Sequence, residues 1–406
     1  HSADNLKEAD VVVISSAVQE DNVEVVQAKA LKIPVIPRAE MLAELMRMKY
    51  GIAVAGAHGK TTTTSMTAQV LEAGGYDPTI IVGGRLNTVG SNAKLGEGDF
   101  IVAEADESDR SFLYLSPFIA VLTNIDEEHL DQYGTLNEIK KTFVYFANKV
   151  PFYCPVILCL DDHNLQSIMP QIERKIITYG FSPEADIQAR DPEFDGFSSY
   201  STLYIHGRKA GRLKLNVPGP HNILNALAAT AVALDLDIEM ETIIKALEDY
   251  TGTGRRFELK KIVNNIMIIE DYAHHPTEIK ATLQAARSGW NRRLVAVFQP
   301  HRFSRLARLK NEFITAFHQA DLLILTEIYP AGEKPIPGVN GQSLFEEIQR
   351  AGQPNVWFEP ELSRLPAFLA EKLRPGDMLL VLGAGHVNRI IPEIIKILER
   401  EKKNGS

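Results

Sequence analysis

Short runs of β-branched and aliphatic residues recur along this chain, and each is followed by a segment long enough for a helix. The runs occupy residues 11–14, 33–36, 52–54, 100–102, 119–122, 156–158, 267–269, 294–297, 322–325 and 378–381. Strands of nearly continuous apolar sequence are typical of parallel sheets covered by helices on both faces, so the pattern predicts an α/β fold. Between Ile187 and Val217 the expected strands are short and polar, with Gly196, Gly207 and Gly211 at turns, which predicts an antiparallel insert.

The length of the chain predicts more than one domain. It has 406 residues, and a domain holds roughly 150. A helix beginning near Arg38 ends before a new strand, so we place the first boundary after Met48. The second lies in the Gly/Thr-rich connector at residues 250–256. The expected domains are residues 1–48, 49–254 and 255–406.

Composition excludes several classes of function. The net charge of −9 does not suit a general binder of nucleic acids or anionic membranes, which needs a basic surface. Two cysteines, Cys154 and Cys159, are too few for a disulfide scaffold or a four-thiolate metal site and fit a reducing compartment. The longest apolar stretch, residues 150–160, is too short to span a bilayer. No apolar signal-peptide core follows His1. We expect a cytoplasmic protein with no nucleic-acid or membrane partner.

A glycine-containing turn between a strand and a helix is the sharpest local motif. It reads Gly56-Ala57-His58-Gly59-Lys60-Thr61-Thr62. Glycines let backbone N–H groups approach phosphate oxygens, the helix start favours negative charge, and Lys60 neutralises it. The Thr61 hydroxyl suits a phosphate-bound Mg²⁺. The common form has a glycine where Val54 stands, so this is a shorter loop. It predicts a nucleoside triphosphate site; the alternative is a turn with a surface lysine.

Acidic residues follow the next strand. Glu104, Asp106, Glu107 and Asp109 come directly after residues 100–102, where carboxylates would reach a nucleotide-bound Mg²⁺. The alternative is a solvated acidic turn. His129, after the strand at 119–122, is a candidate second metal ligand, although a lone histidine is more often structural.

Polar residues also gather at a later helix start and in the second connector. His221, Asn222 and Asn225 suit hydrogen bonds to a base or phosphate, but they can equally be capping residues. Arg255 and Arg256 could reach a triphosphate; the alternative is a pair of surface arginines.

The last third of the chain holds two polar groups at strand ends, residues 271–276 and 299–305. Ligands bind at such ends in doubly wound sheets. Arg302 and Arg305 form a candidate carboxylate clamp. We reject zinc at His274 and His275, because adjacent side chains diverge and no cysteine or third histidine is suitably placed.

Taken in order, these motifs resemble those of the Mur ligase family. The resemblance covers residues 38–42, 56–61, 104–109, 123–131, 219–225, 255–258, 271–276, 301–305 and 329–333. It implies three domains: an incomplete Rossmann-like N-terminal domain, a central P-loop ATPase-type parallel sheet with a small antiparallel insert, and a C-terminal Rossmann-like domain. The family's opening strand and Gly-rich turn would precede His1, so residues 1–48 are expected to be only the C-terminal part of the UDP-sugar-binding domain.

The resemblance also implies a reaction. The Pro-His-Arg sequence at 300–302 and Tyr-Pro-Ala-Gly-Glu at 329–333 match the branch that adds L-alanine to UDP-N-acetylmuramate. In that branch ATP phosphorylates the lactoyl carboxylate, and the amine of L-alanine attacks the acyl phosphate to give an amide, ADP and phosphate in peptidoglycan precursor synthesis. The expected cofactors are ATP and Mg²⁺ at two sites, with Mn²⁺ able to substitute.

Motif positions imply roles for individual residues. The ATP contacts are Gly56, His58, Gly59, Lys60, Thr61, Thr62, Asn222, Asn225, Arg256 and Asp271. The metal ligands are Thr61, Glu104 and His129. The catalytic group is Lys60, Glu104, His129, Arg256 and Asp271. The substrate contacts are Ser15 and Arg38 for the sugar nucleotide, and Tyr272, His274, Arg302 and Arg305 for alanine.

Three other activities share parts of this pattern. They are a ligase that joins a recycled tripeptide to the same UDP sugar, folylpolyglutamate synthase, and a P-loop ATPase with no ligase activity. The last leaves Arg302 and Arg305 unexplained. Nothing in the sequence indicates an oligomeric state.

Overall fold

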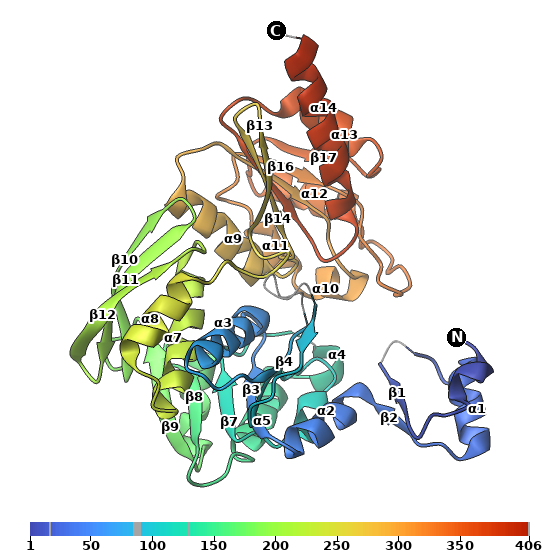
Figure 1. Ribbon diagram of the computed structural model, residues 1–406. Helices are drawn as coiled ribbons and strands as arrows, with labels where there is room; N and C mark the ends of the chain where they lie inside the picture. Colours follow the sequence, from blue (N-terminus) through green and yellow to red (C-terminus); the bar gives the residue numbers. More distant parts are fainter. Residues whose placement is uncertain (16–17, 84–90, 129, 405–406) are drawn as a thin grey trace. The chain divides into compact units, whose positions relative to one another are not determined.

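The computed structural model (Figure 1) describes residues 1–15, 18–83, 91–128 and 130–404. These residues fall into two compact units. Unit 1 consists of His1–Arg190, Thr202–Arg212 and Leu224–Leu247. Unit 2 consists of Asp191–Ser201, Leu213–Ile223 and the chain from Glu248 onward.

The central sheet has ten strands in the order β12-β11-β10-β9-β8-β7-β3-β6-β4-β5. Seven of them are β3 (Tyr50–Ala55), β4 (Thr79–Ile81), β5 (Ala93–Lys94), β6 (Phe100–Glu104), β7 (Ile119–Leu122), β8 (Pro155–Cys159) and β9 (Lys175–Gly180). Apart from β5, these strands run parallel. Strand β3 lies between β7 and β6, so both neighbours end beside its carboxyl end. The predicted parallel sheet is confirmed.

Helices of unit 1 follow these strands as the apolar runs predicted. They are α3 (Lys60–Ala73), α4 (Leu130–Tyr133), α5 (Leu136–Ala147), α6 (His163–Ile168), α7 (Pro220–Asp235, which continues from unit 2) and α8 (Met240–Glu248), with short 3₁₀ helices η2 (Ser111–Tyr114) and η3 (Met169–Gln171). Helix α3 is buried from Thr61 to Ala68, because it packs directly against the sheet. Thr135 and Asp162 cap α5 and α6 by accepting a backbone hydrogen bond.

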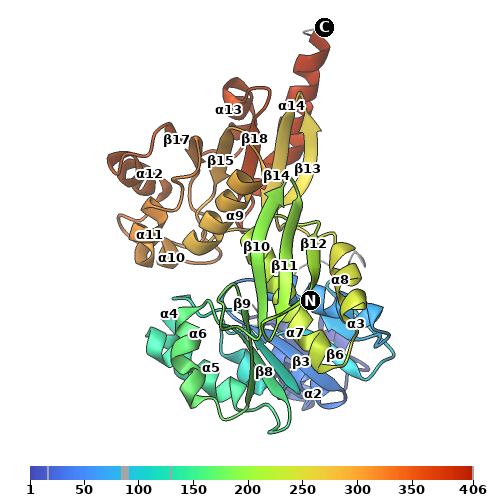
Figure 2. The same cartoon turned by 90° about the vertical axis from the view of Figure 1, so that its left-hand side faces the viewer.

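Three longer strands form the predicted antiparallel insert: β10 (Ile187–Asp195), β11 (Ser198–Ile205) and β12 (Arg208–Leu215), drawn side by side in Figure 2. Two residues join each pair, which only a hairpin allows. His206 and Gly207 both have positive φ, 46° and 74°, as a type I′ turn requires. Gly211, however, does not lie in a turn. It is inside β12, where a Cβ would fall 2.5 Å from Cδ1 of Ile244.

The first 48 residues form a small parallel pair of strands with its helices. The elements are η1 (Ala3–Leu6), β1 (Val12–Ile14), α1 (Val23–Leu31), β2 (Val35–Pro37) and α2 (Arg38–Arg47). Val12 pairs with Val35 and Ile14 with Pro37.

Unit 2 contains a six-stranded sheet in the order β13-β14-β18-β15-β16-β17. Its strands are β13 (Glu258–Val263), β14 (Ile266–Asp271), β15 (Leu294–Phe298), β16 (Leu322–Leu325), β17 (Val356–Phe358) and β18 (Met378–Leu382). All run parallel except β13. Its helices are α9 (Pro276–Gly289), α10 (Phe303–Arg308), α11 (Lys310–Ile314), α12 (Gly341–Arg350), α13 (Leu365–Lys372) and α14 (Ile391–Asn404), with 3₁₀ helix η4 (Val387–Ile390).

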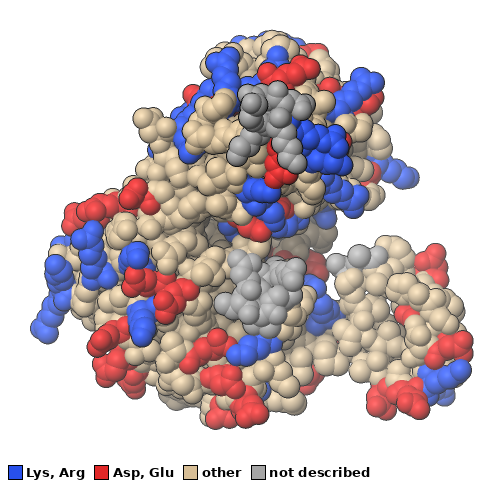
Figure 3. All heavy atoms as spheres, turned by 45° about the horizontal axis from the view of Figure 1, so that its top comes forward, with Lys and Arg blue, Asp and Glu red and all other residues tan. Residues whose placement is uncertain are grey.

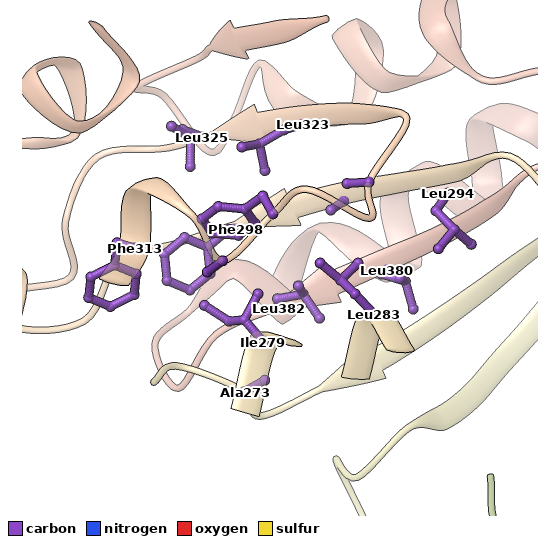
Figure 4. Packing of buried hydrophobic residues seen from close by; sticks show 14 of the residues in the cluster. Ala273, Ile279, Leu283, Leu294, Phe298, Phe313, Leu323, Leu325, Leu380 and Leu382 are labelled. Atoms are coloured by element: carbon purple, nitrogen blue, oxygen red, sulfur yellow. The ribbon is translucent and has the colours of Figure 1, made fainter. Parts of the chain in front are cut away.

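Alternate side chains of this sheet enter two cores, one on each face. Figure 4 shows one of them, where Phe298, Leu323 and Leu380 of three strands meet Ile279 and Leu283 of α9. A parallel sheet with both faces buried is the architecture that the continuous apolar runs predicted.

The surface carries both signs of charge. In Figure 3, Lys and Arg are interspersed with Asp and Glu over a largely uncharged face. Among the described residues, no helix combines the length and apolarity needed to cross a membrane.

Candidate active site

The loop between β3 and α3, residues 56–59, is called the phosphate loop here after its predicted role. Gly56 and Gly59 have φ values of 142° and 83°, which non-glycine residues rarely adopt. A Cβ on Gly56 would lie 2.0 Å from Oγ1 of Thr123, and one on Gly59 would lie 2.7 Å from Oδ1 of Asn225. Only glycine therefore fits at either position. The loop leads directly into α3, whose first N–H groups can donate hydrogen bonds to an anion.

The end of β7 holds this loop in place. Asn124 accepts a hydrogen bond from the His58 N–H at 2.8 Å and donates one to the His58 carbonyl at 3.0 Å. The Thr123 hydroxyl donates to the same carbonyl at 2.6 Å, and Nε2 of His58 lies 2.9 Å from Oδ2 of Asp126. The motif at 123–126 thus positions the phosphate loop, a role that sequence reasoning did not assign to it.

Lys60 lies beneath the loop and contacts Glu107. Its Nζ donates to the carbonyls of Gly56 and Ala57, at 2.6 and 3.3 Å, and lies 2.9 Å from the Glu107 carboxylate. Burial raises the pKa of Glu107 to about 7, against the opposing charge of Lys60. Burial acts to lower the pKa of Lys60, but the carboxylates of Glu107, Asp106 and Glu128 together outweigh it and the net shift is upward.

Two of the three predicted metal ligands are described. Thr61 is the second residue of α3. Glu104 ends β6, where it pairs with Val54 of β3 and accepts a hydrogen bond from the Gly83 N–H at 2.8 Å. The hydroxyl of Thr61, at the start of α3, and the carboxylate of Glu104, at the end of β6, are oxygen ligands of the kind that Mg²⁺ accepts. His129 lies outside the described residues.

Asn225, predicted to contact the nucleotide, lies beside the phosphate loop. It accepts a hydrogen bond from the Thr63 hydroxyl at 3.1 Å and borders Gly59. Thr62, also predicted to contact nucleotide, is largely buried in the first turn of α3. Asn222 donates to the carbonyl of Pro218 at 2.7 Å, a contact typical of a helix start.

In unit 2, Asp271, the last residue of β14, links by hydrogen bonds the residue after the connector to the segment that follows β14. Its two oxygens accept hydrogen bonds from the N–H groups of Phe257 and Ala273, both at 2.7 Å. Burial raises its pKa to about 6, although Arg256 opposes the shift. Arg256 lies 5.4 Å from the centre of the Tyr272 ring. Arg255, in contrast, bonds to Glu270 at 2.7 Å and to the carbonyl of Gly383 at 3.0 Å, a structural role.

A row of aromatic side chains follows the carboxyl ends of this sheet. Successive ring centres of Tyr272, His274, His301, Tyr329 and His386 lie 5.2, 5.7, 5.5 and 4.7 Å apart. His301 and Tyr329 are stacked, with an interplanar angle of 18°. Burial, with the neighbouring positive charges, lowers the pKa of His301 to about 3, so the ring is neutral.

The two predicted clamp arginines border this row. Nη1 of Arg305 lies 3.4 Å from Nδ1 of His301. The backbone N–H of Arg302 donates to the Tyr329 carbonyl at 2.9 Å, and φ of Arg302 is 70°. The four residues predicted to contact alanine thus lie along the carboxyl-end edge of this sheet: Tyr272, His274, Arg302 and Arg305. Sequence reasoning missed Tyr329 and His386 as parts of it; their positions at strand ends were the available signal.

The predicted sugar-nucleotide contacts lie elsewhere in the chain. Ser15 follows β1 and Arg38 opens α2, and both are exposed. Within the described ranges, neither side chain makes a hydrogen bond or ion pair.

Three family matches cover most of the chain. They are the Mur ligase family, catalytic domain at residues 1–50, the Mur ligase middle domain at 54–233, and the Mur ligase, glutamate ligase domain at 255–385. The chain belongs to the Mur ligase family and has its three-domain α/β fold, so the recognition of the family and the predicted fold class are confirmed.

Among curated relatives, the UDP-N-acetylmuramate–L-alanine ligase of Trichlorobacter lovleyi is 56% identical over 98% of this chain and 88% of its own length. The protein of the same name from Myxococcus xanthus is 50% identical over 98% of this chain and 84% of its own. Among solved structures, the UDP-N-acetylmuramate–alanine ligase MurC of Thermotoga maritima matches with a TM-score of 0.83 at 28% identity, covering 99% of this chain and 88% of that one.

Proposed function

We propose that this chain is an ATP-dependent ligase that joins L-alanine to the lactoyl carboxylate of UDP-N-acetylmuramate, with release of ADP and phosphate. The observation that carries the proposal is the identity of 50–56% over almost the whole chain with relatives that bear this name. The reaction passes through an acyl phosphate, as the family resemblance implies. Because the proposed substrates are ATP and a UDP sugar, we propose that the enzyme acts in the cytoplasm, in peptidoglycan precursor synthesis.

The phosphate loop supports the nucleotide half of the reaction. Phosphoryl transfer between two anions depends on cations and oriented N–H groups that offset the charge and hold the reactants in line. Lys60 supplies the cation, and Gly56 and Gly59 allow the backbone to approach the phosphates. Thr61 and Glu104 would hold Mg²⁺, which would neutralise part of the phosphate charge.

The aromatic row of unit 2 supports the amino-acid half. We assign Arg302 and Arg305 to the alanine carboxylate, with Tyr272 and His274 beside it, because two guanidinium groups recognise a carboxylate well. The neutral His301 adds no charge to compete with the ammonium of alanine. On the family resemblance, we assign Asn222, Arg256 and Asp271 to the nucleotide. The proposed division of roles is UDP sugar for residues 1–48, ATP for 49–254 and alanine for 255–406.

One assay tests the proposal. ADP release is measured with ATP, Mg²⁺ and UDP-N-acetylmuramate while only the amine substrate is varied. L-Alanine should support sustained ADP release and amide formation, whereas the tripeptide should not. ADP release that needs only the tripeptide would make the chain the recycling ligase. ADP release that is independent of any amine would make it an ATPase.

A further inference from the structure

Glu107 is a buried carboxylate that contacts Lys60, and the proposed reaction assigns it no role. Its side chain is 5% exposed and that of Lys60 is 17% exposed, and Nζ lies 2.9 Å from the carboxylate. The residue comes from the segment after β6, whereas Lys60 opens α3. The pair therefore joins the phosphate loop to a neighbouring strand end.

All three N–H donors of the Lys60 ammonium have an acceptor in this arrangement. An ammonium donates three hydrogen bonds, and Lys60 has three acceptors: the carbonyls of Gly56 and Ala57 and the carboxylate of Glu107. A phosphate oxygen can bind Lys60 only if one of these acceptors gives it up. Glu107 is the only one of these three acceptors that can carry a negative charge, so it is also the acceptor that a phosphate most closely replaces.

The backbone that carries this carboxylate is held by hydrogen bonds. The Tyr133 hydroxyl donates to the backbone carbonyl of Glu107 at 2.6 Å. The N–H of Arg110 donates to the same carbonyl at 3.1 Å. Asp106 and Glu128 add further negative charge near Lys60. The backbone of Glu107 is anchored, so the carboxylate stays near the phosphate loop when Lys60 exchanges it for another acceptor.

We propose that Glu107 is a positioning residue that holds Lys60 beneath the phosphate loop, and that a nucleoside triphosphate binds by replacing the Glu107 carboxylate on the Lys60 ammonium. The inference rests on the proposed nucleotide site. It adds that Glu107 competes with the phosphates of the nucleotide for the Lys60 ammonium. Before ATP binds, Glu107 pairs with Lys60, so the buried ammonium is not left without a counter-charge. When ATP binds, this ion pair must break.

The first test measures ATP affinity by titration calorimetry with the full chain and Mg²⁺. Glu107→Gln keeps the size of the side chain and removes its charge, so ATP should bind roughly three- to tenfold more tightly than to the wild type. A variant that was merely damaged would bind less tightly. Glu72→Gln is the matched control, because Glu72 also lies in a Lys–Glu pair, with Lys94 on the surface, and its ATP affinity should not change.

The same substitution in a Lys60→Ala background separates two mechanisms. If Glu107 acts through Lys60, Glu107→Gln should leave the affinity of Lys60→Ala unchanged. An equal gain in both backgrounds would mean simple repulsion between Glu107 and the phosphates and would overturn the proposal. Unchanged affinity in Glu107→Gln alone would overturn it too, while the nucleotide site would stand. Failure of the wild type to bind ATP would instead remove the proposed function.

A second measurement is independent of nucleotide. Each single substitution leaves a buried charge without its partner, so Lys60→Ala and Glu107→Gln should each lower the melting temperature, and the double variant should melt above Lys60→Ala. Strictly additive shifts would show that the two side chains are not coupled and would contradict the proposal.

Discussion

Arg302 combines two unusual properties at a single residue. Its φ of 70° and ψ of 136° lie in a region that glycine favours and other residues enter only at a cost in energy. Within the described part of the chain, its guanidinium makes no hydrogen bond or ion pair with another side chain. A strained backbone that presents an unpaired guanidinium beside Arg305 is consistent with a carboxylate clamp.

Substitutions of Arg302 should therefore separate binding from folding. Arg302→Ala and Arg302→Gly should both raise the KM for alanine about ten- to a hundredfold, since each lost charge-assisted hydrogen bond is worth roughly 1.5–3 kcal/mol. Arg302→Gly should be about 1 kcal/mol more stable than Arg302→Ala, because glycine relieves the strain. Steady-state kinetics and urea unfolding measure both effects. A rise in the KM for ATP in place of that for alanine would move Arg302 to the nucleotide site.

Lys60 permits a simpler prediction. Lys60→Ala should abolish amide formation, because the cation facing the developing phosphoryl charge is lost. ATP affinity should fall together with turnover. The fold should persist, as judged by circular dichroism, although with a lower melting temperature because Glu107 loses its partner. Undiminished turnover would contradict the role of Lys60.

Residue types at strand ends were predictable from the sequence, but their pairings were not. Four acidic residues could be placed after residues 100–102, and the structure gives them different surroundings. Glu104 accepts a hydrogen bond from Gly83, whereas Glu107 is buried against Lys60. Which carboxylate turns inward depends on the backbone path between Ala105 and Arg110, and no local pattern in the sequence encodes it.

At the scale of elements, the apolar runs predicted the strands that are buried, but they did not predict the short or exposed strands. The missed strands include β4, with three residues, and β13, which reads Glu-Leu-Lys-Lys-Ile-Val and is largely exposed at the edge of its sheet. An edge strand needs no continuous apolar sequence and often carries lysines. The turn assigned to Gly211 failed because a glycine inside a strand, placed there by close packing, looks the same in sequence as a turn glycine.

Helix α7 gives a prediction about pH. His221 lies in its first turn, and burial, with the nearby charge of Arg256, lowers the His221 pKa to about 4 from 6.5. As the pH falls from 6.5 towards 4, the unfolded chain takes up a proton that the folded chain does not, so the free energy of unfolding decreases. A positive charge at a helix N-terminus is also unfavourable.

His221→Gln should remove this component. Relative to the variant, the wild type should lose about 1–2 kcal/mol of unfolding free energy between pH 7 and pH 5. Urea unfolding of both proteins at the two pH values measures the difference. His206→Gln is the control, because His206 is exposed in a hairpin turn. Equal losses in wild type and His221→Gln would show that His221 titrates normally in the folded chain.

At the scale of the whole molecule, the sequence predicted the class of fold but not the order of the strands. In unit 2, β18 comes last in the chain and yet lies between β14 and β15; in the central sheet, β3 lies between β7 and β6. These insertions bring the ends of distant strands together, as with His301, Tyr329 and His386. Strand order depends on packing between elements far apart in the sequence.

The two tryptophans of the chain allow a final prediction about its two units. Trp290 and Trp357 both lie in unit 2, and Trp290 is stacked on Phe257 at 5.5 Å between ring centres. Tryptophan fluorescence therefore reports the unfolding of unit 2, whereas circular dichroism reports both units. A ligand at 100 times its Kd stabilises the unit that binds it by about 2.7 kcal/mol.

L-Alanine should raise the fluorescence-detected melting temperature. Arg302→Ala should abolish that shift, whereas Lys60→Ala should leave it in place. If Lys60→Ala abolishes the alanine shift and Arg302→Ala does not, the alanine site does not lie on the aromatic row of unit 2.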